Sequence, residues 1–362
     1  MFLINPGRFD SDEGEPAGFN LKNAYFSNSQ IALPFFQHRP LFLIKLNLLP
    51  FHSSFFRLLL LVTFFLAASL IPFIGLFFLM ILPLVLYVLF FLNDPGKTLM
   101  AFLSGLCLIA VILSMMHAVL PAFALAAVGL SGILMAWTAR KNYSIEMVVL
   151  LPSLVILGAI AFYFVYGGLQ LSMSPWQLVE NQMREAIELN MRLYSRLPLN
   201  PEEIQAIQDS KPAIIALFTR IFPALCVIAA LFTVWINLIA AGPILRKHGI
   251  VLPELSALSE WSAPPWLVWI FIAAGAMSVL PQTYIRFPGI NIFLVVSFLY
   301  LLQGLAIVSF FFQNKNISMF FRFLAYFLIA IQQMLMIAIA AVGFFNLWID
   351  FRKYFRKDRT TE

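Results

Sequence analysis

INIFLVVSFLYLLQGLAIVSFFF, residues 290–312, is followed after a short polar link by FFRFLAYFLIAIQQMLMIAIAAVGFFNL, residues 320–347. At the α-helical rise of 1.5 Å per residue, the two runs would be about 35 Å and about 42 Å long. The hydrocarbon core of a bilayer is about 30 Å thick, so each run can cross it. The two runs predict a membrane hairpin that carries uncharged amides, Gln303 in the first run and Gln332 and Gln333 in the second.

The composition extends this interpretation to the whole chain. Of 362 residues, 62% are hydrophobic and 11% are charged, whereas roughly 25% of the residues in a soluble domain are charged. So much apolar surface requires lipid as the solvent, and the sequence predicts an all-α, polytopic transmembrane bundle. The net charge of +6 comes from Lys and Arg at the ends of apolar runs. That pattern is typical of topology determinants and argues against a nucleic-acid partner.

The N-terminal membrane half is predicted over residues 55–169, with about five spans. Apolar sequence from Leu58 to Leu92 is too long for one helix, and Pro72 interrupts it. Residues 1–54 are expected to be disordered or to lie on the membrane surface, because they begin with an acidic segment flanked by Gly and Pro. The expected spans are 56–73, 75–92, two within 98–139 that separate at 117–121, and 145–166.

A polar insert follows at residues 170–212, with six acidic and four basic side chains. Apolar residues recur there every three or four positions from Pro175 onward, which indicates an amphipathic helix. A second short helix is expected to begin at Pro201, because Asn200 can cap it and acids fill its first turn. The insert is therefore interpreted as a hairpin on the membrane or over the bundle, with packing favoured over binding as its role.

The C-terminal membrane half, residues 213–351, leaves the span count open between eight and nine. A sixth helix is predicted from Ala213 to Leu245, and Trp266–Leu280 is either a thin span or a re-entrant segment. If it does not span, eight helices place the basic loops and the basic tail 352–362 on one face and the insert on the other. The positive-inside rule favours that arrangement, with both termini in the cytoplasm.

Small residues are concentrated at 121–132, where Ala, Gly and Ser give one helix a thin face. Tight packing against a neighbouring helix explains such a face, and docking of a partner membrane subunit is the alternative.

No catalytic constellation is visible in the sequence. A metal-binding pair of histidines, a nucleophilic serine motif and a phosphate-cradling glycine loop are all missing, so we expect no enzyme activity and no cofactor. Polar groups inside apolar helices are then the candidates for a ligand site, because burying them in a membrane is costly. The alternatives are interhelical hydrogen bonding for the amides and snorkelling for the arginine. The candidate residues are Arg220, Asn237, Gln303, Gln332 and Gln333.

The C-terminal part also carries a set of motifs between residues 213 and 357. They are Asn237 with Arg246-Lys247, Leu252-Pro-Glu-Leu255, Trp261, Pro264-Pro265-Trp266, Trp269, Tyr300–Ala306 and Trp348–Lys353. This set resembles the YybS-like family of bacterial inner-membrane proteins. That family is distantly similar to the S subunits of energy-coupling-factor transporters, which bind a vitamin or a metal and are driven by a separate ATPase module. The resemblance implies a transport-like fold, although the insert 170–212 and the additional helices depart from S subunits.

Two functional hypotheses follow. The first is a membrane substrate-binding or permease-like subunit that holds a small solute among the buried polar groups. Without a nucleotide motif in this chain, an ATP-driven process would need a separate ATPase subunit. The second is a non-enzymatic scaffold or assembly factor of the cell envelope, whose contact surfaces would be the loop 252–266, the insert and the basic tail.

Overall fold

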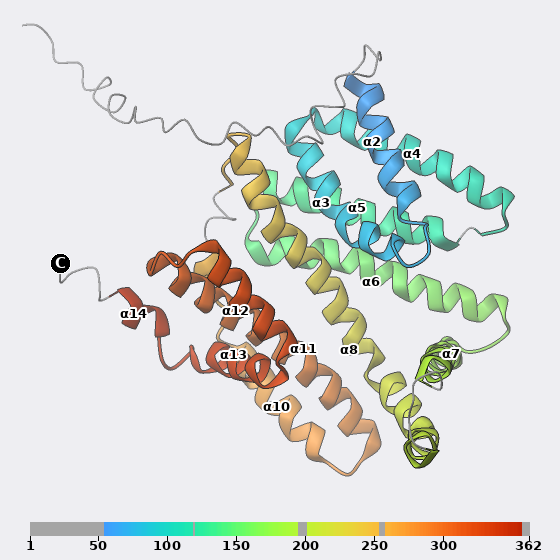
Figure 1. Cartoon of the computed structure of the whole chain (residues 1–362), viewed down its shortest axis with the longest axis vertical. Coiled ribbons are helices and arrows are strands. Elements are labelled where there is room, and N and C mark those ends of the chain that lie inside the picture. Colours follow the sequence, from blue (N-terminus) through green and yellow to red (C-terminus); the bar gives the residue numbers. More distant parts are fainter. Residues whose placement is uncertain (1–53, 119, 195–200, 253–257, 357–362) are drawn as a thin grey trace, which may run out of the picture. The chain divides into compact units, whose positions relative to one another are not determined.

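The computed structural model describes residues 54–118, 120–194, 201–252 and 258–356, and all regular elements in these ranges are helical. The predicted N-terminal segment 1–54 lies outside the described residues except for its last position. In chain order the elements are α2 (Ser54–Ala68), α3 (Gly75–Leu92), α4 (Pro95–Met115), α5 (Leu120–Arg140), α6 (Ile145–Gln170), α7 (Pro175–Tyr194), α8 (Pro201–Lys247), the 3-10 turn η2 (Leu258–Glu260), α10 (Leu267–Val279), α11 (Thr283–Asn314), α12 (Met319–Ile331), α13 (Gln333–Phe345) and α14 (Phe351–Arg356) (Figure 1).

The prediction of an all-α polytopic membrane bundle is confirmed. Within the described residues, six helices are long and apolar enough to cross a membrane, namely α3, α4, α5, α6, α8 and α11, and the bent pair α12–α13 would make a seventh. The expected eight spans are reached only if α2, which is 15 residues long, also crosses. Helix α10 has 13 residues and is therefore about 20 Å long. Whether it is a thin span or a re-entrant segment stays a prediction.

The expected run 320–347 is not one continuous helix, because the chain breaks at Gln332, and the bent pair is either a broken span or a re-entrant loop. Helices α12 and α13 meet there at an angle of 103°, and Gln332 adopts the extended values φ −88° and ψ 104°. Two glycines hold α13 against α11: a Cβ on Gly304 would meet the backbone of Ile339, and a Cβ on Gly343 would meet the backbone of Tyr300. Helix α12 buries no side chain. The direction of α13 is thus set by its close backbone contact with α11, whereas α12 meets the end of α11 through side chains: Arg322 donates to the carbonyl oxygen of Phe312 at 3.0 Å, and Tyr326 packs edge-on against the Phe312 ring.

The predicted short helix from Pro201 is also not separate from the sixth span. Helix α8 runs for 47 residues through Pro212, Pro223 and Pro243. Pro212 removes one backbone hydrogen bond, to the carbonyl of Gln208. Gln208 is exposed, so water can satisfy that carbonyl and the helix continues. The insert is therefore α7 together with the N-terminal part of α8, and α7 packs against both α6 and α8.

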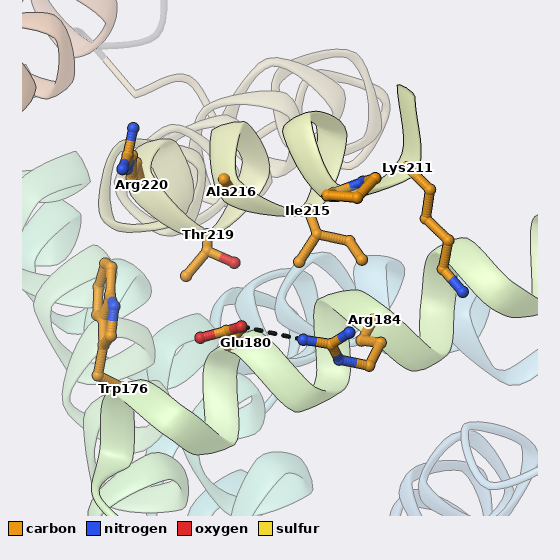
Figure 2. A pocket seen from close by; sticks show the side chains of 9 residues that line it. Trp176, Glu180, Arg184, Lys211, Ile215, Ala216, Thr219 and Arg220 are labelled. Atoms are coloured by element: carbon orange, nitrogen blue, oxygen red, sulfur yellow. Dashed lines mark hydrogen bonds and ion pairs between the residues drawn. The ribbon is translucent and has the colours of Figure 1, made fainter. Parts of the chain in front are cut away.

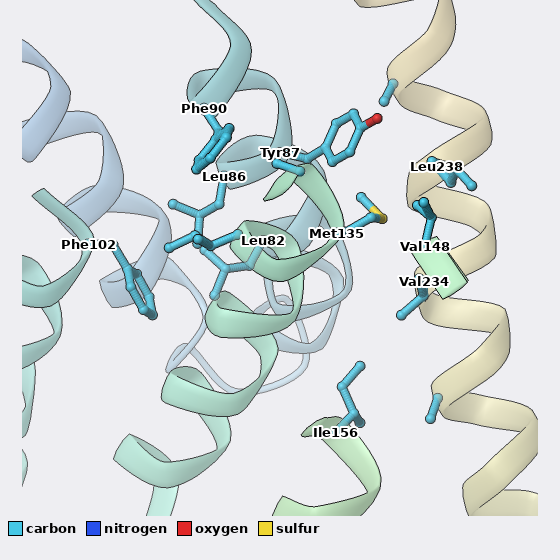
Figure 3. Close-up of a cluster of buried hydrophobic side chains, with 14 of the residues drawn as sticks. Leu82, Leu86, Tyr87, Phe90, Phe102, Met135, Val148, Ile156, Val234 and Leu238 are labelled. Atoms are coloured by element: carbon cyan, nitrogen blue, oxygen red, sulfur yellow. The ribbon is translucent and has the colours of Figure 1, made fainter. Parts of the chain in front are cut away.

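The main core lies where α3, α4, α5, α6 and α8 meet (Figure 3). Leu86 of α3, Phe102 of α4 and Met135 of α5 are fully buried in it, as is Val234 of α8. The predicted tight packing of residues 121–132 is confirmed in this core. A Cβ on Gly132 of α5 would meet the backbone of Pro83 in α3.

The basic residues at the helix ends lie on one side of the bundle, and α7 lies on the other. Short links make α3, α4, α5 and α6 alternate in direction, so Lys97 and Arg140 lie at the same end. Helix α8 runs antiparallel to α6. Ser153 of α6 approaches Ala230 of α8. Glu146, seven residues earlier in α6, is linked through Trp261 to Trp235, which lies five residues later in α8. Its basic end therefore lies on the same side as Arg140. Helix α7 follows α6 and lies at the opposite end.

Candidate functional site

Asn237 acts as a tie between two helices. Its side chain is buried, and its Nδ2 donates to the carbonyl oxygen of Met80 in α3 at 2.8 Å and to that of Thr233 at 2.6 Å. This is the interhelical hydrogen bonding that the sequence left open as the alternative to ligand contact.

Gln303 is also used within the fold. It is buried on α11, and its Oε1 accepts a hydrogen bond from the backbone N–H of Ala263 at 3.2 Å. The amide therefore fixes the segment before α10 to the middle of α11. The next residue, Gly304, lies directly against the backbone of Ile339 in α13.

Gln332 and Gln333 lie at the break between α12 and α13, and both side chains are exposed. The backbone N–H of Gln332 donates to Leu328 and its carbonyl accepts from Met336, so this residue ends one helix and begins the next.

Arg220 lies on α8, exposed, with its guanidinium 4.3 Å from the centre of the Phe287 ring. Seventeen residues of helix separate it from Asn237, a distance of about 25 Å. The five predicted residues are therefore not gathered into one site, and a ligand-binding role for each of them stays a prediction.

Asn291 was not among the candidate residues predicted from the sequence, although it is a polar residue near the start of the apolar run 290–312. Its Oδ1 accepts from the backbone N–H of Ala224 at 2.9 Å, and its Nδ2 donates to the carbonyl oxygen of Arg220 at 2.9 Å. In an uninterrupted helix those two backbone groups would bond to each other. The side chain from α11 thus engages the backbone of α8 directly beside Arg220.

A polar pocket of about 440 Å³ opens between α7 and α8, next to Arg220 (Figure 2). Trp176, Glu180 and Arg184 line it from α7, at intervals of four residues that place them along one face of the helix. Lys211, Thr219 and Arg220 line it from α8. The sequence shows the periodicity of each helix, but it does not show which faces meet, and for that reason the pocket was missed.

Ion pairs hold the walls of this pocket. Arg184 Nη2 lies 3.1 Å from Glu180 Oε1 within α7, and Lys211 Nζ of α8 lies 2.8 Å from Glu188 Oε1 of α7. The hydrogen bond from Lys211, together with its charge, lowers the pKa of Glu188. The Lys211–Glu188 pair links α8 to α7 across the side of the pocket.

Thr219 is the unusual member of the pocket. Its side chain is 4% exposed, and its hydroxyl has no hydrogen-bond partner within the described chain. Figure 2 shows it pointing from α8 into the space above Glu180. A buried hydroxyl normally has a partner, because desolvating it without one costs about 1–3 kcal/mol. The pocket therefore contains a donor and acceptor that the fold itself leaves unused.

A family model described as "Predicted membrane protein (DUF2232)" matches residues 59–347. The chain belongs to this family. No curated protein and no solved structure gives a significant match. Membership agrees with the bundle of apolar helices, and the DUF2232 match covers both halves of that bundle and the α7–α8 pocket.

Among the described residues of this DUF2232 protein, no group of three His, Cys, Asp or Glu side chains is close enough to hold a metal ion. The two described cysteines, Cys107 and Cys226, are unpaired. The α7–α8 pocket is accordingly described by its charges and its hydroxyl: it can hold an anionic or mixed-charge group through hydrogen bonds.

Proposed function

We propose that this DUF2232 protein is a non-enzymatic solute-binding subunit of the bacterial inner membrane, with the α7–α8 pocket as its binding site. The observation that carries the proposal is the buried, unpartnered hydroxyl of Thr219 in a pocket lined by cationic side chains. This assignment moves the site away from the buried amides. Asn237 and Gln303 already have partners inside the protein, whereas Thr219 has none in the described chain.

The helix ends support an orientation for this site. Lys97, Arg140 and Arg246 lie at the end of the bundle opposite α7. Positively charged loops are retained in the cytoplasm, so the α7–α8 pocket would face the outside of the inner membrane. The pocket would then receive its solute from the outer side.

ATP-driven transport would need a second chain. The sequence holds no phosphate-cradling glycine loop, so a separate ATPase subunit would have to bind and hydrolyse the ATP. The resemblance of the sequence to S subunits of energy-coupling-factor transporters predicts such a module as the partner, with contact at the cytoplasmic end where the basic residues lie, but no Ala-x-x-x-Ala face on the first helix supports that contact.

The proposal is tested by purifying the tagged protein from native membranes and identifying by mass spectrometry what it retains. Wild type should retain a small molecule that the pocket variant Arg184→Gln/Lys211→Gln loses. The double variant Lys97→Gln/Arg140→Gln, which removes the same charge at the other end, should retain it. Equal retention by both double variants, or no retained molecule with wild type, would contradict the site.

A scaffold or assembly factor of the cell envelope is the second candidate, and α12 is the observation that favours it. Its 13 residues bury no side chain, and Phe320, Phe321 and Phe323 are each more than half exposed. Lipid contact accounts for such a surface, but so does a partner helix. Stoichiometric recovery of envelope proteins with wild type, unchanged in the Arg184→Gln/Lys211→Gln variant, would favour the scaffold.

A further inference from the structure

We infer that the α7–α8 pocket binds the phosphate group of a membrane amphiphile, that is, a phospholipid-like headgroup at the surface of the bilayer. This inference rests on the proposed function and specifies the class of solute. Its basis is the combination of Arg184, Lys211 and the hydroxyl of Thr219 around one cavity of about 440 Å³.

The charges of the pocket favour an anion. Arg184, Lys211 and Arg220 line it with one carboxylate, Glu180, and Lys211 also pairs with Glu188 just outside the lining, so these five groups carry a formal charge of 3 − 2 = +1. Guanidinium and ammonium groups are the common partners of phosphate oxygens, and Arg can donate two parallel hydrogen bonds. Because Glu180 also faces the cavity, a headgroup with an added amine or hydroxyl is compatible with the same walls.

Arg184 is free to change partner. Its ion pair with Glu180 joins two side chains that are 50% and 45% exposed, and exposed pairs contribute little to stability. Turning the guanidinium toward a phosphate would therefore lose little and gain a charge-assisted hydrogen bond.

Thr219 gives the pocket a fixed donor. Its hydroxyl is buried and unpartnered in the described chain, and the neighbouring Ile215 is buried beside it on the same face of α8. A phosphate oxygen that enters the pocket would accept from this hydroxyl. The ligand would then satisfy a group that the fold alone leaves without a hydrogen bond.

The surroundings favour a lipid over a free ion. Leu217 and Phe218, next to Thr219 in sequence, are 52% and 41% exposed, on a helix that is apolar enough to cross the membrane. Trp176, half exposed at the pocket, is a residue type that gathers at the membrane–water interface. Trp176 thus gives the pocket an aromatic edge, and the acyl chains of a bound lipid would run around α8 toward the exposed Leu217 and Phe218 on its other faces.

The inference is tested by native mass spectrometry of the full chain in detergent. The protein is titrated separately with dihexanoyl phosphatidylglycerol, with dihexanoylglycerol, which lacks the phosphate, and with inorganic phosphate, which lacks the lipid. Wild type should bind one phosphatidylglycerol, at least tenfold more tightly than dihexanoylglycerol. Thr219→Val and Arg184→Gln should each weaken that binding at least fivefold. The matched controls Thr233→Val, on the same helix, and Arg140→Gln, at the other end, should bind as wild type does.

Folding is checked on the same samples by melting without lipid. Thr219→Val removes a desolvated hydroxyl while keeping the side-chain volume, so its melting temperature without lipid should equal or exceed that of wild type. Its melting temperature should rise less than that of wild type when phosphatidylglycerol is added. Equal binding by Thr219→Val, Arg184→Gln and wild type would overturn the inference.

The remaining outcomes separate the sources and the two proposals. Competition by inorganic phosphate at the concentration of the lipid would overturn the lipid assignment and leave a free-phosphate site. A small molecule from native membranes that pocket variants lose, together with no preference for phosphatidylglycerol, would overturn this inference while the proposed function stands. Pocket variants that keep both the native small molecule and the binding of phosphatidylglycerol would overturn this inference and the proposed function.

Discussion

The indole N–H of Trp261 donates a hydrogen bond of 2.9 Å to Oε1 of Glu146, which lies 115 residues earlier at the start of α6. The carbonyl oxygen of Trp261 accepts from Arg352 at 2.7 Å, and its ring meets that of Trp235 in α8 at 5.2 Å. One loop residue therefore joins α6, α8 and α14. Arg352, expected in a free basic tail at 352–362, is instead buried against this loop.

Trp261→Phe should lower the stability by about 1–2 kcal/mol, because it leaves a carboxylate without its indole donor while it keeps the aromatic ring. The effect is measured as a lower melting temperature in detergent. Trp266→Phe is the matched control, since Trp266 is 59% exposed and should tolerate the change. Equal melting temperatures for the two variants would show that the Trp261–Glu146 bond does not hold the helices together.

Gly304→Ala and Gly343→Ala should each destabilise the protein by about 2–4 kcal/mol, because the added methyl group would meet the backbone of the facing helix. The loss would appear as lower yield of folded protein and a lower melting temperature. Gly158→Ala on α6 is the control: a Cβ there meets no atom within 4 Å, and the change should stabilise the helix by up to about 1 kcal/mol. A Gly343→Ala protein as stable as wild type would contradict the seating of α13 on α11.

Asn237→Ala should cost about 1–2 kcal/mol, because it removes the hydrogen bond from α8 to Met80 in α3. Retention of the native solute should be unchanged, since Asn237 lies about 25 Å along the helix from Arg220. Melting and mass spectrometry of the same preparation separate the two effects. A variant of full stability that has lost the solute would restore Asn237 as a ligand residue.

Acid should loosen α7 from α8 through Glu188. Its pKa is lowered by the hydrogen bond and charge of Lys211, with smaller contributions from the charges of Arg192 and Arg184. A carboxylate with a lowered folded-state pKa stabilises the fold above its unfolded value, about 4.3, and this stabilisation is lost as the pH falls through the folded-state pKa. Amide exchange in α7, corrected for the intrinsic pH dependence, should therefore be less protected at pH 3 than at pH 6.

Glu188→Gln is the control for that measurement. The variant should show a smaller change in α7 protection between pH 6 and pH 3, because the amide does not titrate. An identical pH dependence in the variant and wild type would assign the loosening to other carboxylates.

Several elements were predicted correctly from local signals. The expected spans 75–92 and 145–166 correspond to α3 and α6, the two spans expected within 98–139 correspond to α4 and α5, and Pro175 begins α7 as expected. These boundaries are set by proline, by capping residues and by apolar length, all of which act within a few residues along the chain.

Other features carried no local signal. Gln332 breaks a run that contains neither Pro nor Gly at that point, because α13 is held by α11. Pro212, which looked like a boundary, lies inside a continuous helix. Asn291 and Thr219 gain their importance from the helices they face, since one engages the backbone of α8 and the other is left unpartnered beside α7.

The sequence by itself determined that this protein is a helical membrane bundle, because composition and apolar length depend only on how much of the chain must avoid water. It also determined the amphipathic character of α7, because helical periodicity is a local property. Only the tertiary structure decided that Asn237 ties α8 to α3, that Gln303 holds the segment before α10, and that a polar pocket forms between α7 and α8. Those features depend on which faces meet, and contacts between residues as distant as Met80 and Asn237 are set by the packing of the whole bundle.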